Sequence, residues 1–185
     1  MAQALPSFTG SISGAPPIVH RGSVYVGHVD QTGLYALDAR DGGPRWQYQT
    51  KDSINQAALG FQNGVFASTG DVLLAFDLRG HKQWTYRTGS DRMSNSSPAI
   101  GGGKVLYTTE IIGSVVGIEP DEAGASEWRF QRDVSFGLPT VATGTAYIPA
   151  RGRDSDRIVA VDVGDRRRDL DDDAKSVRPG DRPVD

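Results

Sequence analysis

The feature that most constrains the fold of this chain is an internal repeat of about 40 residues. Turn glycines recur at Gly22, Gly64, Gly103 and Gly144, with spacings of 42, 39 and 41 residues. Such a period is typical of helical HEAT-type repeats or of radially repeated β-sheets. Each repeat contains a short run of β-branched and aromatic residues, namely VYVG, VFAS, VLYT and AYIP. These runs are typical of strands, and no segment shows a sustained helical period.

The pattern within each repeat predicts four short strands. In the first repeat they lie at Pro17–Val19, Val24–Gly27, Leu34–Asp38 and Trp46–Thr50. Four strands per unit at this period describe a β-propeller blade. We therefore expect an all-β fold, a partial ring of about four four-stranded antiparallel blades with the last blade incomplete. The repeats occupy residues 1–163, with blades near 17–50, 59–88, 98–131 and 139–163.

A spaced motif of a small residue, an acid, a glycine and a tryptophan joins the third and fourth strands. In order, its positions are Ala36, Asp38, Gly42 and Trp46; Ala75, Asp77, Gly80 and Trp84; and Gly117, Glu119, Gly124 and Trp128. The fourth repeat keeps Ala160 and Asp162 and has no tryptophan after them. The pattern resembles the tryptophan-docking motif AxDxxTGxxxW of the pyrroloquinoline-quinone-type (PQQ-like) propeller repeat. That family includes quinoprotein dehydrogenases and non-enzymatic BamB-type propellers.

The motif has a structural interpretation. The small residue lets neighbouring sheets approach closely, the acid accepts hydrogen bonds from turn amides, and glycine permits a turn with positive φ. The indole is expected to lie flat between adjacent blades and to donate its N–H to a backbone carbonyl. The motif residues are therefore expected to be structural, and we predict no catalytic, cofactor-binding or metal-binding residue in the chain.

The C-terminal segment, residues 164–185, breaks the repeat. Of its 22 residues 13 are charged, and its apolar residues are Leu170, Ala174, Val177 and Val184. So few apolar side chains cannot offset the entropy lost on ordering, so we expect a disordered, dispensable tail. It begins where the fourth strand of the fourth blade is due, which also fits a truncated or frameshifted reading frame.

Composition excludes several functions. The chain has no cysteine, which removes disulfides, thiolate metal sites and cysteine nucleophiles. A net charge of −3 does not provide the excess of positive charge that is typical of nucleic-acid-binding proteins. No apolar run is long enough for a transmembrane helix. Aspartate outnumbers glutamate 19 to 4, a halophile-like bias. The N-terminus has no signal-peptide pattern, although the family resemblance implies an extracytoplasmic or cell-surface location.

Candidate sites for chemistry are weak. Quinoprotein dehydrogenases bind PQQ with a cysteine pair, a tryptophan floor and a calcium ion held by Glu, Asn and Asp, and the cysteine pair is impossible here. Glu110 is the one glutamate after a second strand that is placed to face a channel. The histidines His20, His28 and His81 fall in separate turns without metal-ligand spacing. The run Asp169-x-Asp171-x-Asp173 starts like a calcium loop but lacks its glycine and glutamate.

These observations favour a non-catalytic binding or scaffold propeller. Its partner would be a protein or the remainder of a parent propeller, with homo-oligomerisation or aggregation through open blade edges. One alternative is a fragment of a PQQ-dependent oxidoreductase whose catalytic and calcium-binding residues lie outside this chain. A third is the sensor part of a larger membrane-anchored or kinase-linked protein.

Overall fold

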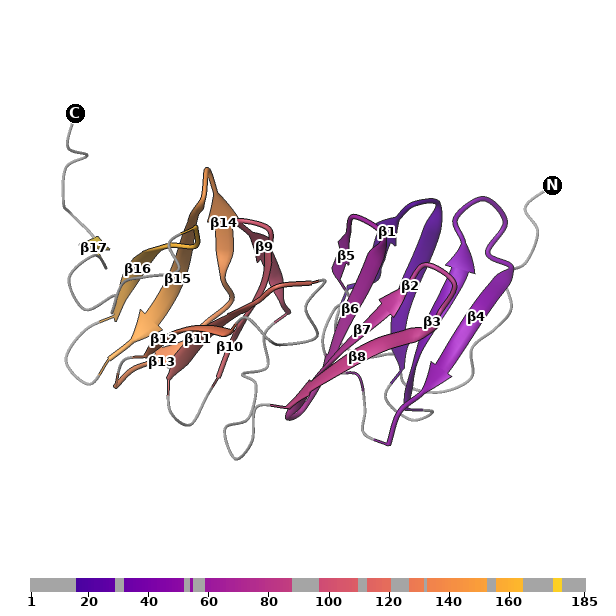
Figure 1. Ribbon diagram of the computed structural model, residues 1–185, viewed down its shortest axis with the longest axis horizontal. Coiled ribbons are helices and arrows are strands. Elements are labelled where there is room, and N and C mark those ends of the chain that lie inside the picture. The colour runs from indigo at the N-terminus through magenta and orange to yellow at the C-terminus, as the bar shows by residue number, and fades with distance from the viewer. Residues whose placement is uncertain are drawn as a thin grey trace. The chain divides into compact units, whose positions relative to one another are not determined.

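The computed structural model describes residues 16–28, 32–51, 54, 59–87, 97–109, 113–120, 127–131, 133–152, 156–164 and 175–177. Regular structure in these residues consists of β-strands alone, in sheets that Figure 1 displays. This confirms the all-β fold class. Within the same residues, no helix long and apolar enough to cross a membrane is found.

The first two sheets follow the predicted blade pattern and belong to the compact unit 1–98. The first comprises β1 (Ile18–His20), β2 (Ser23–His28), β3 (Gly33–Asp38) and β4 (Pro44–Gln49). The second comprises β5 (Leu59–Phe61), β6 (Gly64–Thr69), β7 (Val72–Asp77) and β8 (Lys82–Arg87). Each sheet is antiparallel, with its strands side by side in chain order.

The other two sheets belong to the compact unit 99–185, so the repeat domain expected over 1–163 is divided between two units. The third sheet comprises β9 (Ala99–Gly101), β10 (Lys104–Thr108), β11 (Ser114–Ile118) and β12 (Glu127–Gln131). The fourth comprises β13 (Ser135–Phe136), β14 (Thr140–Ala142), β15 (Thr145–Arg151), β16 (Asp156–Asp162) and β17 (Lys175–Val177). Strands β13 and β14 both pair with β15 and together take the first position.

The short strand β17 differs from the expectation of a disordered tail. Its three residues pair antiparallel with β16 at Ile158, Val159 and Ala160, in the position of the missing fourth strand (Figure 1). The pairing is a backbone property, so apolar side chains are not needed for it. The other residues of 165–185 lie outside the described part of the chain.

The turns between the first and second strands explain why glycine recurs there in the repeats. Arg21 and Gly22 have φ of 49° and 74°, and Thr143 and Gly144 have φ of 47° and 81°. Positive φ at both central residues defines the hairpin turn whose twist matches that of the strands. In the second sheet Gln62 has a φ of 49° at the equivalent turn, and Gly64, expected as a turn glycine, is instead the first residue of β6.

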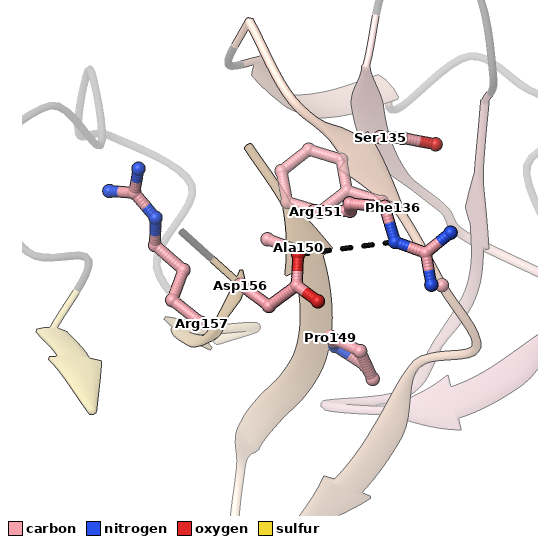
Figure 2. A pocket seen from close by; sticks show the side chains of 8 residues that line it. Ser135, Phe136, Pro149, Ala150, Arg151, Asp156 and Arg157 are labelled. Atoms are coloured by element: carbon pink, nitrogen blue, oxygen red, sulfur yellow. Dashed lines mark ion pairs between the residues drawn. The ribbon is translucent and has the colours of Figure 1, made fainter. Parts of the chain in front are cut away.

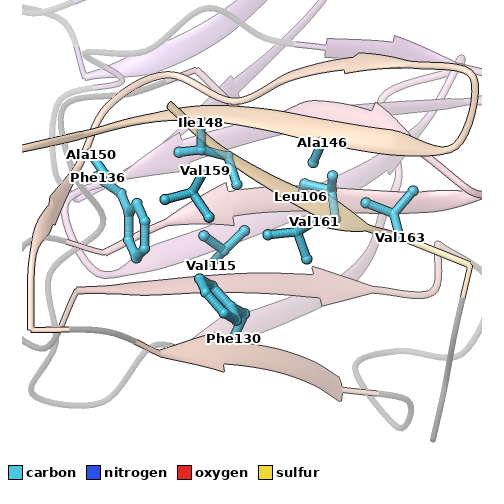
Figure 3. Close-up of a cluster of buried hydrophobic side chains, with 10 residues drawn as sticks. All are labelled: Leu106, Val115, Phe130, Phe136, Ala146, Ile148, Ala150, Val159, Val161 and Val163. Carbon is cyan, nitrogen blue, oxygen red and sulfur yellow. The ribbon is translucent and has the colours of Figure 1, made fainter. Parts of the chain in front are cut away.

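Each unit has its own core between the facing sides of its two sheets. In unit 1–98 the buried side chains of the first sheet meet those of the second. This cluster contains Tyr25, Leu34, Ala36, Ile54, Val65, Ala67, Val72, Leu74 and Phe76. Figure 3 shows the core of unit 99–185. It contains Leu106, Val115, Phe130, Phe136, Ala146, Ile148, Ala150, Val159, Val161 and Val163.

Candidate functional site

The first motif acid, Asp38, organises the turn between β3 and β4. Its Oδ1 accepts the amide N–H of Arg40 at 2.8 Å, and its Oδ2 accepts Nη2 of Arg45 at 2.7 Å. Arg45 also donates from Nη1 to Oγ of Ser23 at 2.7 Å. The hydrogen bond from Arg45 and then that from Arg40 hold the pKa of Asp38 below its usual value. The acid thus joins three strands of one sheet at their shared end.

The second motif acid, Asp77, plays the same part with different partners. Its Oδ1 accepts the amide N–H groups of Arg79 at 2.8 Å and of His81 at 2.9 Å, and its Oδ2 lies 2.9 Å from Nδ1 of His81. Desolvation alone would raise the pKa of Asp77. The hydrogen bonds from His81 and Arg79 outweigh it and lower that pKa below its ordinary value.

The first tryptophan, Trp46, crosses from the first sheet to the second. Its Nε1 donates to the carbonyl oxygen of Leu78 at 3.0 Å, in the turn that follows Asp77. The indole lies 5.7 Å from the ring of Tyr25 and 5.9 Å from that of Phe76. A Cβ added at Gly80 would come within 2.6 Å of the indole, and Gly80 also has a φ of 87°. Glycine is therefore required there for both the turn and the contact.

The remaining motif residues lie at the corresponding places of their own sheets. Ala75 and Trp84 are buried, Ala160 is half-buried, and Gly117 is the register partner of Trp128. Oδ1 of Asp162 accepts the amide N–H of Gly164 at 2.8 Å, as Asp38 and Asp77 do from their own turns. Gly42 has a φ of 73°. Gly124 lies outside the described residues, as do Glu110 and the acidic run at 169–173, and the side chain of Trp128 is not described.

The third acid, Glu119, has a partner that sequence reasoning missed. Nζ of the buried Lys104 lies 3.5 Å from Oε1 of Glu119. Lys104 begins β10 and Glu119 follows β11, so the antiparallel pairing of these strands places the two residues together. The motif acids of the first three sheets are thus next to a basic side chain: Arg45, His81 or Lys104.

The motif also defines a row of cross-strand neighbours in each sheet, which we call the docking row. It consists of a second-strand residue, the small motif residue and a fourth-strand residue that are register partners. The four rows are Tyr25–Ala36–Trp46, Phe66–Ala75–Trp84, Leu106–Gly117–Trp128 and Tyr147–Ala160–Lys175. In the fourth sheet Lys175 therefore occupies the register position of the tryptophan.

The fourth sheet exposes the face that carries this row. Tyr147 is 41% exposed and Ile158 is 46% exposed, and Pro149, the register partner of Ile158, is exposed as well. We call Tyr147, Pro149, Ile158 and Ala160 the open face. The opposite side of β15 and β16 is buried in the core of unit 99–185. The absence of a fourth tryptophan was the one sequence signal that distinguished this blade.

A hollow of about 300 Å³ lies beside the open face. Phe136, Pro149 and Ala150 form its apolar lining, and Arg151 and Asp156 stand at its edge (Figure 2). Nε of Arg151 lies 3.9 Å from Oδ1 of Asp156, and both side chains are largely exposed, so the pair is weak. Arg157 points away from the pair. We assign no ligand to this hollow.

The comparisons with known proteins identify the family. A family model described as "Outer membrane protein assembly factor BamB" matches residues 3–128. The chain belongs to the BamB-like family of PQQ-like propellers. This confirms the resemblance inferred from the docking motif. A serine/threonine-protein kinase, AfsK of Streptomyces griseus, is 27% identical in an alignment of 150 residues that covers 72% of this chain and 18% of the kinase.

Solved structures show the same fold. BamB from Moraxella catarrhalis matches with a TM-score of 0.66 and 23% identity, over 83% of this chain and 47% of that one. The quinohemoprotein alcohol dehydrogenase of Comamonas testosteroni matches with a TM-score of 0.69 and 17% identity, over 84% and 34%. The computationally designed protein Ika4 matches with a TM-score of 0.67 and 11% identity, over 85% and 98%. The four sheets are thus β-propeller blades, and the BamB-like chain spans under half of the natural relatives named here.

The residues that the structure describes do not supply the groups with which quinoprotein dehydrogenases hold PQQ and calcium. The cysteine pair is absent from the sequence. Among the described residues, no three of the types His, Asp, Glu and Cys are grouped so that they would hold a metal ion. Trp46 is held by Leu78 and Gly80, and Trp84 is buried, so neither offers a free ring face as the floor of a quinone site.

Proposed function

We propose that this chain is a non-catalytic PQQ-like propeller protein that binds protein through the open face of its fourth blade. The proposal rests on the exposure of Tyr147 and Ile158, which lie on a sheet whose other side is packed in the core of unit 99–185. Apolar side chains that stand together on an exposed face mark interaction sites, and a tyrosine serves such a site well because its ring is apolar and its hydroxyl polar.

The chemistry of the motif supports a scaffold. The motif acids that the structure describes hold turns and basic side chains within their own sheets, and Trp46 joins two blades. These side chains therefore stabilise the fold, whereas the open face exposes the apolar side chains of Tyr147 and Ile158. Similarity to a protein called an assembly factor also supports a role in holding other proteins.

The likeness to quinohemoprotein alcohol dehydrogenases favours a second candidate, a segment of a PQQ-dependent oxidoreductase. Its catalytic and calcium-binding residues would be supplied from outside this chain. The reading frame on either side of the chain's coding sequence separates the two. A flanking cysteine pair with a set of Asn and Asp calcium ligands would favour the oxidoreductase, and further plain propeller repeats would favour the scaffold.

The match to the kinase favours a related role, in which the propeller is the binding or sensing part of a larger signalling protein. The reading frame around the chain's coding sequence tests it. A kinase domain in the same frame supports this role, and a frame that encodes further propeller repeats alone contradicts it.

Site-specific photocross-linking tests the proposed function itself. A photoreactive phenylalanine analogue replaces Tyr147 on the open face or, as a matched control, Thr143 in the exposed turn between β14 and β15. The chain is then irradiated in the cells that express it. A protein adduct of defined mass at position 147 and none at 143 is the expected result. Equal labelling at both positions, or no protein adduct at 147, would overturn the proposal.

A further inference from the structure

The docking rows allow the open face to be compared with the equivalent faces of the other blades. In the first three blades the second-strand residue of the row is buried, at Tyr25, Phe66 and Leu106. The fourth, Tyr147, is 41% exposed. The third strands repeat the contrast, because Leu34, Leu73 and Val115 are fully buried and Ile158 is 46% exposed. These residues occupy equivalent positions, two before the small motif residue, so the difference lies in what covers them.

The first blade presents the complementary side. Its face away from the core of unit 1–98 carries the cross-strand neighbours Val19, Val24 and Leu37. Val19 is 71% exposed, and Val24 and Leu37 are half-buried. In the second blade the same row is Gly60, Val65 and Phe76, and its valine and phenylalanine are buried against the first blade. The first blade therefore carries a receiving face that no described residue fills.

One chain thus holds both halves of an interface that it already forms internally. The core of unit 1–98 packs the docking row of the first blade against the receiving face of the second. The core of unit 99–185 does the same for the third and fourth blades, with Leu106 and Val115 against Ala146 and Val161. The open face of the fourth blade and the receiving face of the first blade are both exposed, and they carry the two halves of the same kind of pair. Their best-matched occupant is therefore another copy of this chain.

We propose that a second copy of this chain packs the receiving face of its first blade against the open face of the fourth blade. This inference rests on the proposed function and names the partner. The contact is head-to-tail, because two different faces meet, so the copies either close a ring or form an extended assembly.

The residue at the tryptophan position sets the strength of this contact. Within the chain, Trp46 reaches the carbonyl of Leu78 and lies over Gly80. On the receiving face of the second copy, Ala39 takes the place of Leu78 and Gly42, with a φ of 73°, takes the place of Gly80. The fourth blade places Lys175 where the indole is needed. The contact between copies therefore lacks the indole, and Lys175→Trp should strengthen it.

Sedimentation equilibrium of the purified chain tests the proposal with two complementary variants. Val19→Asp places a charge on the receiving face and Ile158→Asp places one on the open face. Both residues are exposed, so each variant should keep its β-sheet circular dichroism. Thr143→Asp, in an exposed turn with φ of 47° that aspartate tolerates, is the matched control.

The expected result is self-association of the wild type and of Thr143→Asp at micromolar concentration. Val19→Asp and Ile158→Asp should each sediment as a 19.8 kDa monomer. An equimolar mixture of these two variants should form a heterodimer, since one intact pair of faces remains. Lys175→Trp should lower the dissociation constant at least about tenfold, a change of about 1.4 kcal/mol.

Two results would overturn the proposal: a monomeric wild type at high micromolar concentration, or Val19→Asp that associates as the wild type does. If either occurs while position 147 still cross-links to a different protein, the second copy is the wrong partner and the protein-binding function stands. If position 147 forms no protein adduct at all, both proposals fail.

Discussion

Replacing Trp46 by alanine should destabilise unit 1–98 more than any substitution at an exposed strand position. The indole contacts Tyr25, Phe76 and Gly80, and it donates a hydrogen bond of 3.0 Å to Leu78. Truncating a fully buried tryptophan costs about 3–5 kcal/mol. Because Trp46 is half-buried, we scale the packing loss to about 2–3 kcal/mol and add about 1 kcal/mol for the hydrogen bond.

Urea denaturation followed by circular dichroism measures this loss, which we expect to be about 3–4 kcal/mol in total. Trp46→Phe keeps most of the ring contact and removes the N–H donor, so it should cost about 1–2 kcal/mol. Gln47→Ala, at the exposed neighbouring position of β4, should stay within about 0.5 kcal/mol. If Trp46→Ala costs no more than Gln47→Ala, the indole does not join the two blades and the reasoning is refuted.

Three further outcomes follow from the same geometry. Gly80→Ala should cost at least about 2 kcal/mol in urea denaturation, since it is strained at a φ of 87° and its Cβ meets the indole; a neutral effect would contradict the contact. The pKa of Asp77 in the folded state is lowered from 3.8, so the carboxylate stabilises the fold above that pH and this contribution is lost as the pH falls through the lower folded value. The free energy of unfolding of Asp77→Asn should therefore lie below that of the wild type at neutral pH, and the difference should shrink below about pH 4. A difference that does not depend on pH would show that the charge of Asp77 is not involved. Deleting residues 175–185 should lower the melting temperature, because β16 loses its paired strand, and an unchanged melting curve would restore the expectation of a dispensable tail.

The blade architecture could be predicted because its determinants are local and repeated. The hairpin turns, the β-branched runs and the spacing from Asp38 to Trp46 each signal one part of a blade. The spacing also predicted the destination of an indole N–H, a backbone carbonyl of the neighbouring blade, which the structure shows for Trp46 and Leu78.

Features that depend on long-range pairing were not predicted. The ion pair of Lys104 and Glu119 depends on the register between two strands. Strand β13 contains only Ser135 and Phe136, too few residues for a recognisable alternation. Strand β17 joins the sheet through its backbone, so its polar composition concealed it.

The open face was also out of reach of the sequence, for a different reason. Tyr147 and Ile158 resemble the residues at equivalent positions in the other blades, and nothing in their own segments marks them as exposed. Their exposure depends on the packing of the whole fourth sheet. The missing tryptophan indicated an incomplete blade, and the structure was needed to place Lys175 at the register position of that tryptophan.

Thiol labelling at position 147 tests the central claim, that the open face is a protein-binding surface, most directly. The chain contains no cysteine, so Tyr147→Cys and Thr143→Cys each provide a single reporter. At nanomolar concentration both thiols should react rapidly with a maleimide. As the chain concentration rises into the micromolar range, labelling at 147 should slow at least about tenfold while labelling at 143 stays constant, since a second copy covers the open face. Slow labelling at 147 at every concentration would show that the face is not open, and rapid labelling at every concentration would show that no second copy binds there.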